Sequence, residues 1–247
     1  MAKRKKRPAI GPEFMRRTHF KNMEPTGQAC REPPPMPELH YQGETLDLPD
    51  PTKIETTAID LNKAINERRS ERVFLEDSTM TLDELTYLCW ATQGVKEFDQ
   101  GETFRTVPSA GARHAFETYI VVNNVEGVDK GLYRYLSLGH KLGVLERSEE
   151  IGDQIAHSTL QPDLIQMSYA TFIWTAVAAR MTWRYGDRGY RYMHLDAGHV
   201  GQNLYLGAMA VNCQVCTSAA FNDDDLNRAL KLDGVDHFAL YFGAVGK

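Results

Sequence analysis

The 247 residues, 42% of them hydrophobic and 25% charged, have the composition of a folded globular protein whose core needs no disulfide bonds. The formal net charge of −5 is uneven: residues 1–40 hold nine Lys or Arg and four Asp or Glu, a local charge of +5, so the rest of the chain carries −10. Such an acidic body excludes a general nucleic-acid binder. The basic run at residues 3–7 predicts a solvated tail, with a functional nucleic-acid or membrane-surface patch as the alternative.

The same sequence indicates a cytoplasmic protein that does not enter a membrane. No apolar run reaches the about 18 residues of a membrane-spanning helix. Pro8, Gly11 and Pro12 follow the basic start, where a secretory signal has an apolar stretch. Only four cysteines are present, which is typical of a chain that keeps its thiols reduced.

Residues 1–57 predict an extended, Pro-rich arm with a basic tail, and residues 58–247 the folded domain. Proline does not fit inside helices or central strands, and the arm contains the prolines Pro33, Pro34, Pro35, Pro37, Pro49 and Pro51. An arm of this kind wraps its own body or a partner subunit.

Two helices are predicted at the start of the domain. Residues 59–69 place Ile59, Leu61 and Ile65 near one helical face. Thr81 is the predicted N-cap of the second helix, with Glu84 completing a capping box, and this helix is expected to end near Gly94.

Strand and helix patterns alternate after that point. Aromatic and β-branched residues predict strands at 116–123, 131–135 and 141–146. A helix is expected from residue 151 to 160, and the apolar run 171–181 predicts a strand buried on both faces.

Residues 189–211 predict the longest helix, with an apolar stripe and an unusual number of small residues: Ala197, Gly198, Gly201, Gly207, Ala208 and Ala210. Glycine inside a helix costs about 1 kcal/mol relative to Ala, so another segment must approach closely. Tight internal packing and a subunit interface explain this equally well. A strand (213–218), a helix capped near residues 222–225 and a last strand (237–245) complete an α+β order.

Two short motifs carry the chemistry. Arg68, Arg69, Ser70 and Arg72 place three guanidiniums and a hydroxyl within five residues, and arginine matches phosphate and polar ring edges. The alternative is a solvated basic patch at a helix C-terminus. The run 105–112 contains Pro108, Ser109, Ala110 and Gly111, whose small side chains allow a flat ligand to approach the main chain; an ordinary tight loop is the alternative.

The ordered pair Arg-Arg-Ser-x-Arg and Pro-Ser-Ala-Gly resembles the nitroreductase superfamily, and within it the SagB-type branch that includes azoline oxidases. The segments 131–135, 194–204 and 220–224 match the same branch, so the resemblance covers about residues 59–246. It implies an α+β fold with a mostly antiparallel central sheet flanked by helices, a domain-sharing homodimer, and FMN at the subunit interface.

The resemblance also implies the cofactor-binding residues. Arg68, Arg69, Ser70 and Arg72 would hold the phosphate, the ribityl chain and the pyrimidine edge of FMN. The loop at 108–111 would reach the flavin from the other subunit, the backbone at Ala219 and Ala220 would lie by flavin N5, and Lys247 would meet the phosphate.

The implied activity is ping-pong hydride transfer from NAD(P)H through FMN to a small organic acceptor, since the flavin supplies the reaction and the protein its orientation. One alternative is a SagB-type dehydrogenase that oxidises a peptide azoline. Two others are a non-catalytic flavin-binding protein and a catalytically silent interaction subunit. The identity of the substrate does not follow from the sequence.

Arg184 and Tyr185 are the candidate catalytic pair, because azoline oxidases of this branch carry Lys-Tyr at about this place. Arginine stays protonated and is a poor base, which argues against azoline oxidation, while Tyr185 remains able to act as an acid or to orient a substrate. The alternative is the polar end of a strand. Cys213 and Cys216 are expected in the core, and no metal site is predicted.

Overall fold

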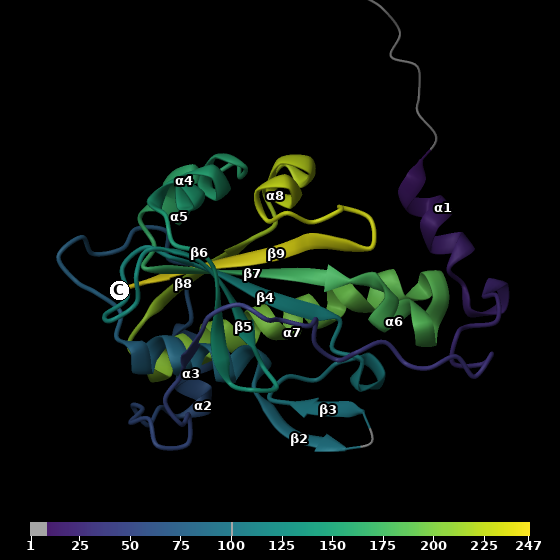
Figure 1. Cartoon of the computed structure of the whole chain (residues 1–247), viewed down its shortest axis with the longest axis horizontal. Coiled ribbons are helices and arrows are strands. Elements are labelled where there is room, and N and C mark those ends of the chain that lie inside the picture. The colour runs from purple at the N-terminus through teal and green to yellow at the C-terminus, as the bar shows by residue number, and fades with distance from the viewer. Residues whose placement is uncertain (1–8, 100) are drawn as a thin grey trace, which may run out of the picture.

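An antiparallel sheet of seven strands forms the centre of the computed structural model, which describes residues 9–99 and 101–247 (Figure 1). The strand order is β1-β6-β5-β4-β7-β9-β8, and every neighbouring pair is antiparallel. The bounds are β1 Thr45–Asp47, β4 Phe116–Val122, β5 Gly131–Leu136, β6 Lys141–Glu146, β7 Ala170–Val177, β8 Gln214–Ser218 and β9 His237–Gly246. A separate hairpin, β2 (Val95–Asp99) with β3 (Glu102–Arg105), projects from one side of the molecule.

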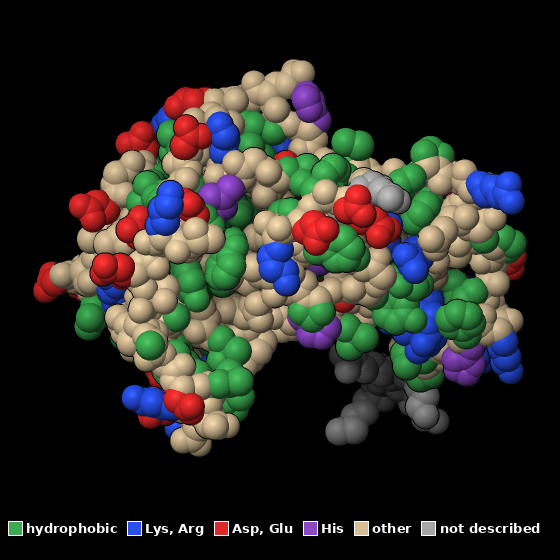
Figure 2. Space-filling view, turned by 90° about the horizontal axis from the view of Figure 1, so that it is seen from below, with side chains coloured by type: hydrophobic (Ala, Val, Ile, Leu, Met, Phe, Trp, Pro, Cys, Tyr) green, Lys and Arg blue, Asp and Glu red, His purple; other side chains and the backbone are tan. Residues whose placement is uncertain are grey.

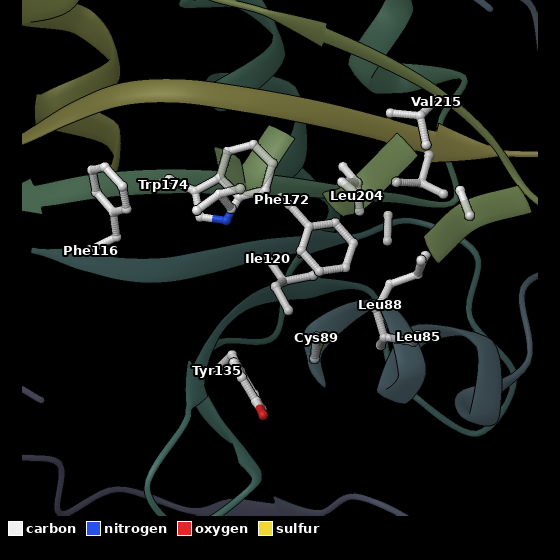
Figure 3. Packing of buried hydrophobic residues seen from close by; sticks show 14 of the residues in the cluster. Leu85, Leu88, Cys89, Phe116, Ile120, Tyr135, Phe172, Trp174, Leu204 and Val215 are labelled. Atoms are coloured by element: carbon white, nitrogen blue, oxygen red, sulfur yellow. The ribbon is translucent and has the colours of Figure 1, made fainter. Parts of the chain in front are cut away.

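Helices cover both faces of the sheet (Figure 1). One face carries α4 (Glu149–His157), α5 (Pro162–Gln166) and α8 (Asp223–Ala229), and the other carries α3 (Leu82–Gln93) and α7 (Gly189–Ala210), with α2 (Leu61–Glu67) beside them. Each layer has its own apolar core; Figure 3 shows Leu88, Phe172 and Leu204 packed between the sheet and the α3–α7 layer. The predicted α+β class with a mostly antiparallel, helix-flanked sheet is confirmed.

Local sequence signals place most element boundaries. The Thr81 side chain accepts a hydrogen bond from the Glu84 N–H while the Glu84 carboxylate accepts one from the Thr81 N–H, so the predicted capping box is formed. The helix ends at Gln93, with Gly94 as its C-cap, as expected. Cys213 and Cys216 are both buried, in the two different apolar cores.

The predicted strand 171–181 is wrong in its second part. β7 ends at Val177, and the helix α6 (Ala178–Tyr185) follows directly. A buried apolar run does not by itself distinguish a strand from a helix, and residues 178–181 (Ala-Ala-Arg-Met) are strong helix formers. Arg184 and Tyr185 therefore lie at the C-terminal end of a helix and not at a strand end.

The N-terminal arm is not extended throughout. Residues 10–17 form the helix α1 (Ile10–Arg17), residues 20–22 a short 3-10 turn, and β1 adds to the sheet edge beside β6. The basic tail, residues 1–8, lies outside the described part of the chain. The arm crosses the body from α6 to that sheet edge (Figure 1), and the Gln28 N–H donates to the Trp183 carbonyl at 2.8 Å. It wraps its own chain next to α6.

The predicted apolar face of the first domain helix is not buried in the single chain. Leu61 is 63% and Ile65 58% exposed. The small residues of α7 divide into two groups: Gly207 contacts α3 and Gly201 the Tyr241 ring, whereas a Cβ at Gly198 would meet no atom within 4 Å. Internal packing thus explains part of the small-residue stretch and leaves the part around Gly198 open.

Candidate functional site

The first half of the candidate site is assembled around Tyr205 of α7. Its hydroxyl lies 2.9 Å from the Ser70 Oγ and accepts a hydrogen bond from the Thr217 N–H at 3.0 Å. The Arg68 guanidinium lies over the Tyr205 ring, 5.1 Å from its centroid. The structure therefore joins the Arg-Arg-Ser motif to β8, the strand that leads to Ala219. Sequence reasoning missed Tyr205, whose only signal was a polar ring in a helix rich in small residues.

Three guanidiniums surround this half of the site. Arg69 and Arg72 are exposed, and they donate only to nearby backbone carbonyls, at 3.0–3.2 Å. Among the described residues no carboxylate forms an ion pair with either of them or with Arg68. Beside them is a cavity of about 200 Å³, lined by Arg68, Arg69, Tyr205 and residues of β8 among others, and also by Glu67 and Glu71, which form no ion pair with these arginines. The arrangement leaves positive charge free to bind an anion.

The second half of the site is the loop at 108–111, held by Asp196 of α7. The Ser109 Oγ donates to the Asp196 carboxylate at 2.6 Å, and the Ala110 N–H donates to it at 3.2 Å. The Ser109 Oγ in turn accepts a hydrogen bond from the His114 N–H at 2.9 Å. Burial raises the pKa of Asp196, and the hydrogen bonds from Ser109 and Ala110 oppose that rise. Asp196 lies in the segment 194–204 that resembles the family, but sequence reasoning gave it no role, because a lone carboxylate in a long helix does not show what it binds.

Arg184 and Tyr185 meet this loop directly. Gly111 has φ +57°, and a Cβ there would collide with the Tyr185 hydroxyl and lie 3.0 Å from the Arg184 Nε. The Tyr185 ring packs edge-on against Tyr192, with 4.7 Å between the ring centroids. The structure therefore brings together three segments that lie apart in the sequence: the Pro-Ser-Ala-Gly loop, the Arg-Tyr pair and the long helix.

A buried charge network under the arm fixes the position of α6. Glu117 pairs with Arg180 of α6 and accepts a hydrogen bond from the Leu39 N–H at 2.8 Å. Arg180 also donates to the Met36 carbonyl and Arg134 to the Leu39 carbonyl, both at 2.8 Å. Because Arg180 lies one turn before Arg184, these contacts also hold the Arg-Tyr pair against its loop.

The remaining predicted residues lie at two other places. Ala219 is exposed just beyond β8, while the Ala220 carbonyl accepts a hydrogen bond from the Leu160 N–H at 2.8 Å. Lys247 pairs with the Glu84 carboxylate at 2.8 Å and donates to the Thr79 carbonyl at 3.0 Å. Lys247 thus already has a carboxylate partner in its own chain.

The two halves lie apart along α7. Asp196 and Tyr205 are nine residues apart, which corresponds to roughly 13 Å of helix. Within the described residues, no three His, Cys, Asp or Glu side chains come together in a way that suits a metal ion. In that same part of the chain, no helix has both the length and the apolar character needed to cross a membrane.

The α+β fold, its antiparallel sheet and the two half-sites on α7 can be compared with those of known protein families. Residues 65–247 match the family described as "Nitroreductase family". The chain belongs to the nitroreductase family, whose members are typically FMN-dependent oxidoreductases.

Individual relatives agree with this assignment. The chain is 36% identical over 190 residues to MJ1384 of Methanocaldococcus jannaschii, which is named after this family; the match covers 77% of this chain and 92% of the relative. It is 28% identical to the trifolitoxin-processing protein TfxB of Rhizobium leguminosarum bv. trifolii, covering 74% of this chain and 52% of TfxB.

Solved structures extend the comparison. A protein of Anabaena variabilis named after the family has a TM-score of 0.63 and 29% identity, covering 74% of this chain and 37% of that one. A structure from Desulfovibrio desulfuricans in complex with FMN has a TM-score of 0.54 and 16% identity, covering 77% and 87%. The chain thus spans about half of TfxB and little more than a third of the Anabaena protein.

Proposed function

We propose that the protein is an FMN-dependent oxidoreductase that works as a homodimer and passes a hydride from NAD(P)H to a small organic acceptor in ping-pong half-reactions. The observation that carries this proposal is the division of the site into two halves on α7, around Tyr205 and around Asp196. The cavity of the first half, about 200 Å³, is smaller than the about 300–1,000 Å³ of a typical ligand pocket. A second copy of the chain, related by a twofold axis, would bring the 108–111 loop of one subunit to the arginines of the other.

The residues present fit an anionic flavin nucleotide. Arg68, Arg69 and Arg72 have no carboxylate partner in the described chain and suit a phosphate and the polar pyrimidine edge. Ser70, held by Tyr205, would donate to the ribityl chain or the phosphate. Lys247 is a weaker candidate for the phosphate, since Glu84 already neutralises it.

The other half supplies a flat approach to the ring. Pro108, Ser109, Ala110 and Gly111 present small side chains, and Asp196 holds their backbone in place. The exposed backbone at Ala219, with Ala220 next to it, would lie beside flavin N5. When bound, FMN supplies hydride acceptance and release; the chain binds it, orients it and, through the Tyr185 hydroxyl, orients the acceptor or supplies a proton.

Exposed apolar side chains on α2 and α7 favour the homodimer. Leu61, Ile65 and Leu195 are all more than half exposed, and Gly198 lies close to Leu195 on an open helix surface. Figure 2 shows hydrophobic side chains between charged ones on the side of the molecule that carries α2, α3 and the β2–β3 hairpin. Burying such side chains in a subunit interface contributes about 25 cal/mol for each Å² removed from water.

The decisive experiment is an anaerobic titration of the purified full-length protein with NADH and NADPH, followed by visible flavin absorbance and cofactor extraction. We expect bound FMN at about one per subunit, and bleaching by at least one of the two donors. Arg72→Ala should reduce the FMN retained, whereas Arg228→Ala, on the far helix α8, should not. If FMN is bound but neither NADH nor NADPH bleaches it, the protein binds flavin without this activity. A colourless protein that takes up no FMN would refute the proposal.

A second candidate is oxidation of a peptide azoline. The trifolitoxin-processing relative supports it, and Arg184 in place of the branch's lysine argues against it, because a guanidinium does not accept a proton. Incubating the flavin-loaded protein with a thiazoline-containing peptide under air tests this directly. A mass loss of two hydrogens would favour this candidate over reduction of a small acceptor.

A further inference from the structure

Arg184 is a half-buried guanidinium without a counter-charge. Among the described residues it forms no ion pair and donates no hydrogen bond, although its Nε lies beside the Gly111 backbone. In the described part of the chain, its cation–π contact is with the ring of the next residue, Tyr185, 5.8 Å from the centroid. A partly desolvated charge of this kind is costly unless an anion accompanies it.

The surroundings of Arg184 add positive charge. Arg113 pairs with Glu102 of the hairpin at 3.0 Å and lies over the Trp183 ring. Burial lowers the pKa of Arg113, Glu102 raises it, and the nearby charge of Arg184 lowers it again. The guanidiniums of Arg113 and Arg184 therefore repel each other. Glu102 neutralises only one of them, so the group keeps one net positive charge.

Two further arginines follow Arg184 in the chain, Arg188 at the turn before α7 and Arg191 in its first turn, and within the described residues they donate only to neutral groups. Arg188 donates to the Tyr192 hydroxyl and to the Thr18 carbonyl, both at 2.8 Å. Arg191 donates to the Thr18 hydroxyl at 2.7 Å and to the Met15 carbonyl. The arm thus positions these side chains without neutralising them.

Half-buried aromatic rings also lie around Arg184. Tyr185 lies against Gly111 of the 108–111 loop, and the Tyr192 ring packs edge-on against it; both rings are partly exposed. Trp183, also partly exposed, lies beneath the Arg113 guanidinium. Flat apolar rings favour a flat organic ligand through edge and stacking contacts. A guanidinium set among them favours a carboxylate on that ligand, because its planar fork matches the carboxylate oxygens.

Resting on the proposed function, we infer that Arg184 determines substrate specificity: it binds the carboxylate of an aromatic acid that enters as the hydride acceptor. The structure points to this role because the guanidinium has no partner and lies at the loop that would border the flavin. The arginine is then a recognition group, and its inability to act as a base is no obstacle.

The test compares benzoate with benzamide, which have nearly the same shape and differ in charge. Calorimetry on the FMN-loaded, full-length protein measures both dissociation constants without any turnover. We expect benzoate to bind at least about tenfold more tightly, the effect of one hydrogen-bonded ion pair. The preference should shrink as salt is raised, while benzamide binding stays constant.

Three variants test whether the Arg184 side chain causes the preference for benzoate over benzamide. Arg184→Gln should reduce the ratio of the two dissociation constants to within about twofold. Arg184→Lys should keep part of it, since the charge remains without the planar fork. Arg228→Gln, which removes the same charge from exposed α8, should leave the ratio as in the wild type. The ratio of kcat/KM for 4-nitrobenzoate and 4-nitrobenzamide should change in parallel.

The possible outcomes separate the two proposals. Equal binding of benzoate and benzamide by the wild type, with normal FMN content, would overturn this inference and leave the proposed function intact. Loss of FMN from Arg184→Gln with an unchanged ligand ratio would assign the guanidinium to the cofactor. If Arg184→Gln slows flavin reduction by NADPH by the same factor as it weakens benzoate binding, the anion that Arg184 binds would be the dinucleotide. Absence of FMN from the wild type would instead refute the proposed function itself.

Discussion

Gly111 and Tyr185 are packed so closely that no side chain fits between them: a Cβ on Gly111 would collide with the Tyr185 hydroxyl. Gly111 also has φ +57°, a conformation that costs L-residues about 1–2 kcal/mol. The loop that would border the flavin and the helix that carries Arg184 are thus in direct contact. Any change at this glycine acts on both.

Gly111→Ala is therefore expected to impair the site beyond its effect on stability. Gly127→Ala is the matched control, because Gly127 also has positive φ (+74°) but nothing within 4 Å of its added Cβ. The backbone strain should cost both variants about 1 kcal/mol of unfolding free energy in denaturant titrations, and Gly111→Ala should lose more, because the Tyr185 side chain must also shift. Only Gly111→Ala should also lower NAD(P)H-dependent turnover; equal activity in the two variants would contradict the contact.

Tyr205→Phe tests the first half of the site. The substitution keeps the ring under Arg68 and removes the hydroxyl that lies between Ser70 and Thr217. We expect weaker FMN binding, by about five- to tenfold, since one or two hydrogen bonds are lost. Fluorescence titration of the apoprotein with FMN measures it.

Tyr133→Phe is the control for this measurement. Its hydroxyl donates to the Asp129 carbonyl at 2.7 Å, away from α7, so the variant loses a comparable hydrogen bond at another place. Wild-type FMN affinity in Tyr205→Phe, or an equal loss in both variants, would show that the Ser70–Tyr205 contact does not support the cofactor.

Leu195→Glu tests the homodimer. Leu195 is 61% exposed on α7, and a charge buried at a subunit interface is strongly unfavourable. The wild type should elute from gel filtration at about twice 27.9 kDa, and the variant should shift toward the monomer and lose FMN. Leu138→Glu, in the turn between β5 and β6, should remain a dimer. A monomeric wild type with full FMN content would contradict the shared site.

The acid sensitivity of the fold is expected to depend in part on His114. Burial, reinforced by the charges of Arg105 and Arg113, lowers the pKa of His114 to about 3. Between about pH 6.5 and pH 3 the unfolded chain therefore binds a proton that the folded chain does not. This contribution to stability is complete above pH 6.5 and falls by up to about 1.4 kcal/mol per pH unit below it.

His114→Asn isolates this contribution. Asn tolerates the positive φ of this position (+42°) and does not titrate. Urea unfolding from pH 7 to pH 4 should show a shallower loss of stability for the variant than for the wild type. Parallel curves for the two proteins would mean that His114 takes up its proton in the folded state as readily as in the unfolded chain.

Most secondary structure was predictable because its signals are local. The capping box of Thr81 and Glu84, the Gly94 C-cap and the alternating strands each lie within a few residues of sequence. The error at residues 178–181 has the same origin, since a buried apolar run carries no periodicity that separates a strand from a helix. The exposed face of Leu61 and Ile65 shows another limit: an apolar face indicates that something covers it and does not say whether that is the same chain.

By itself the sequence determined the fold class, the family and the order of the motifs, because these depend on residue types along a short stretch of chain. The tertiary structure alone decided which motifs meet. Ser70 and Tyr205 form a hydrogen bond although 135 residues separate them in the sequence, and Ser109 and Asp196 do so across 87 residues. Contacts at that separation are set by how α7 packs against the sheet, and no local pattern encodes that packing.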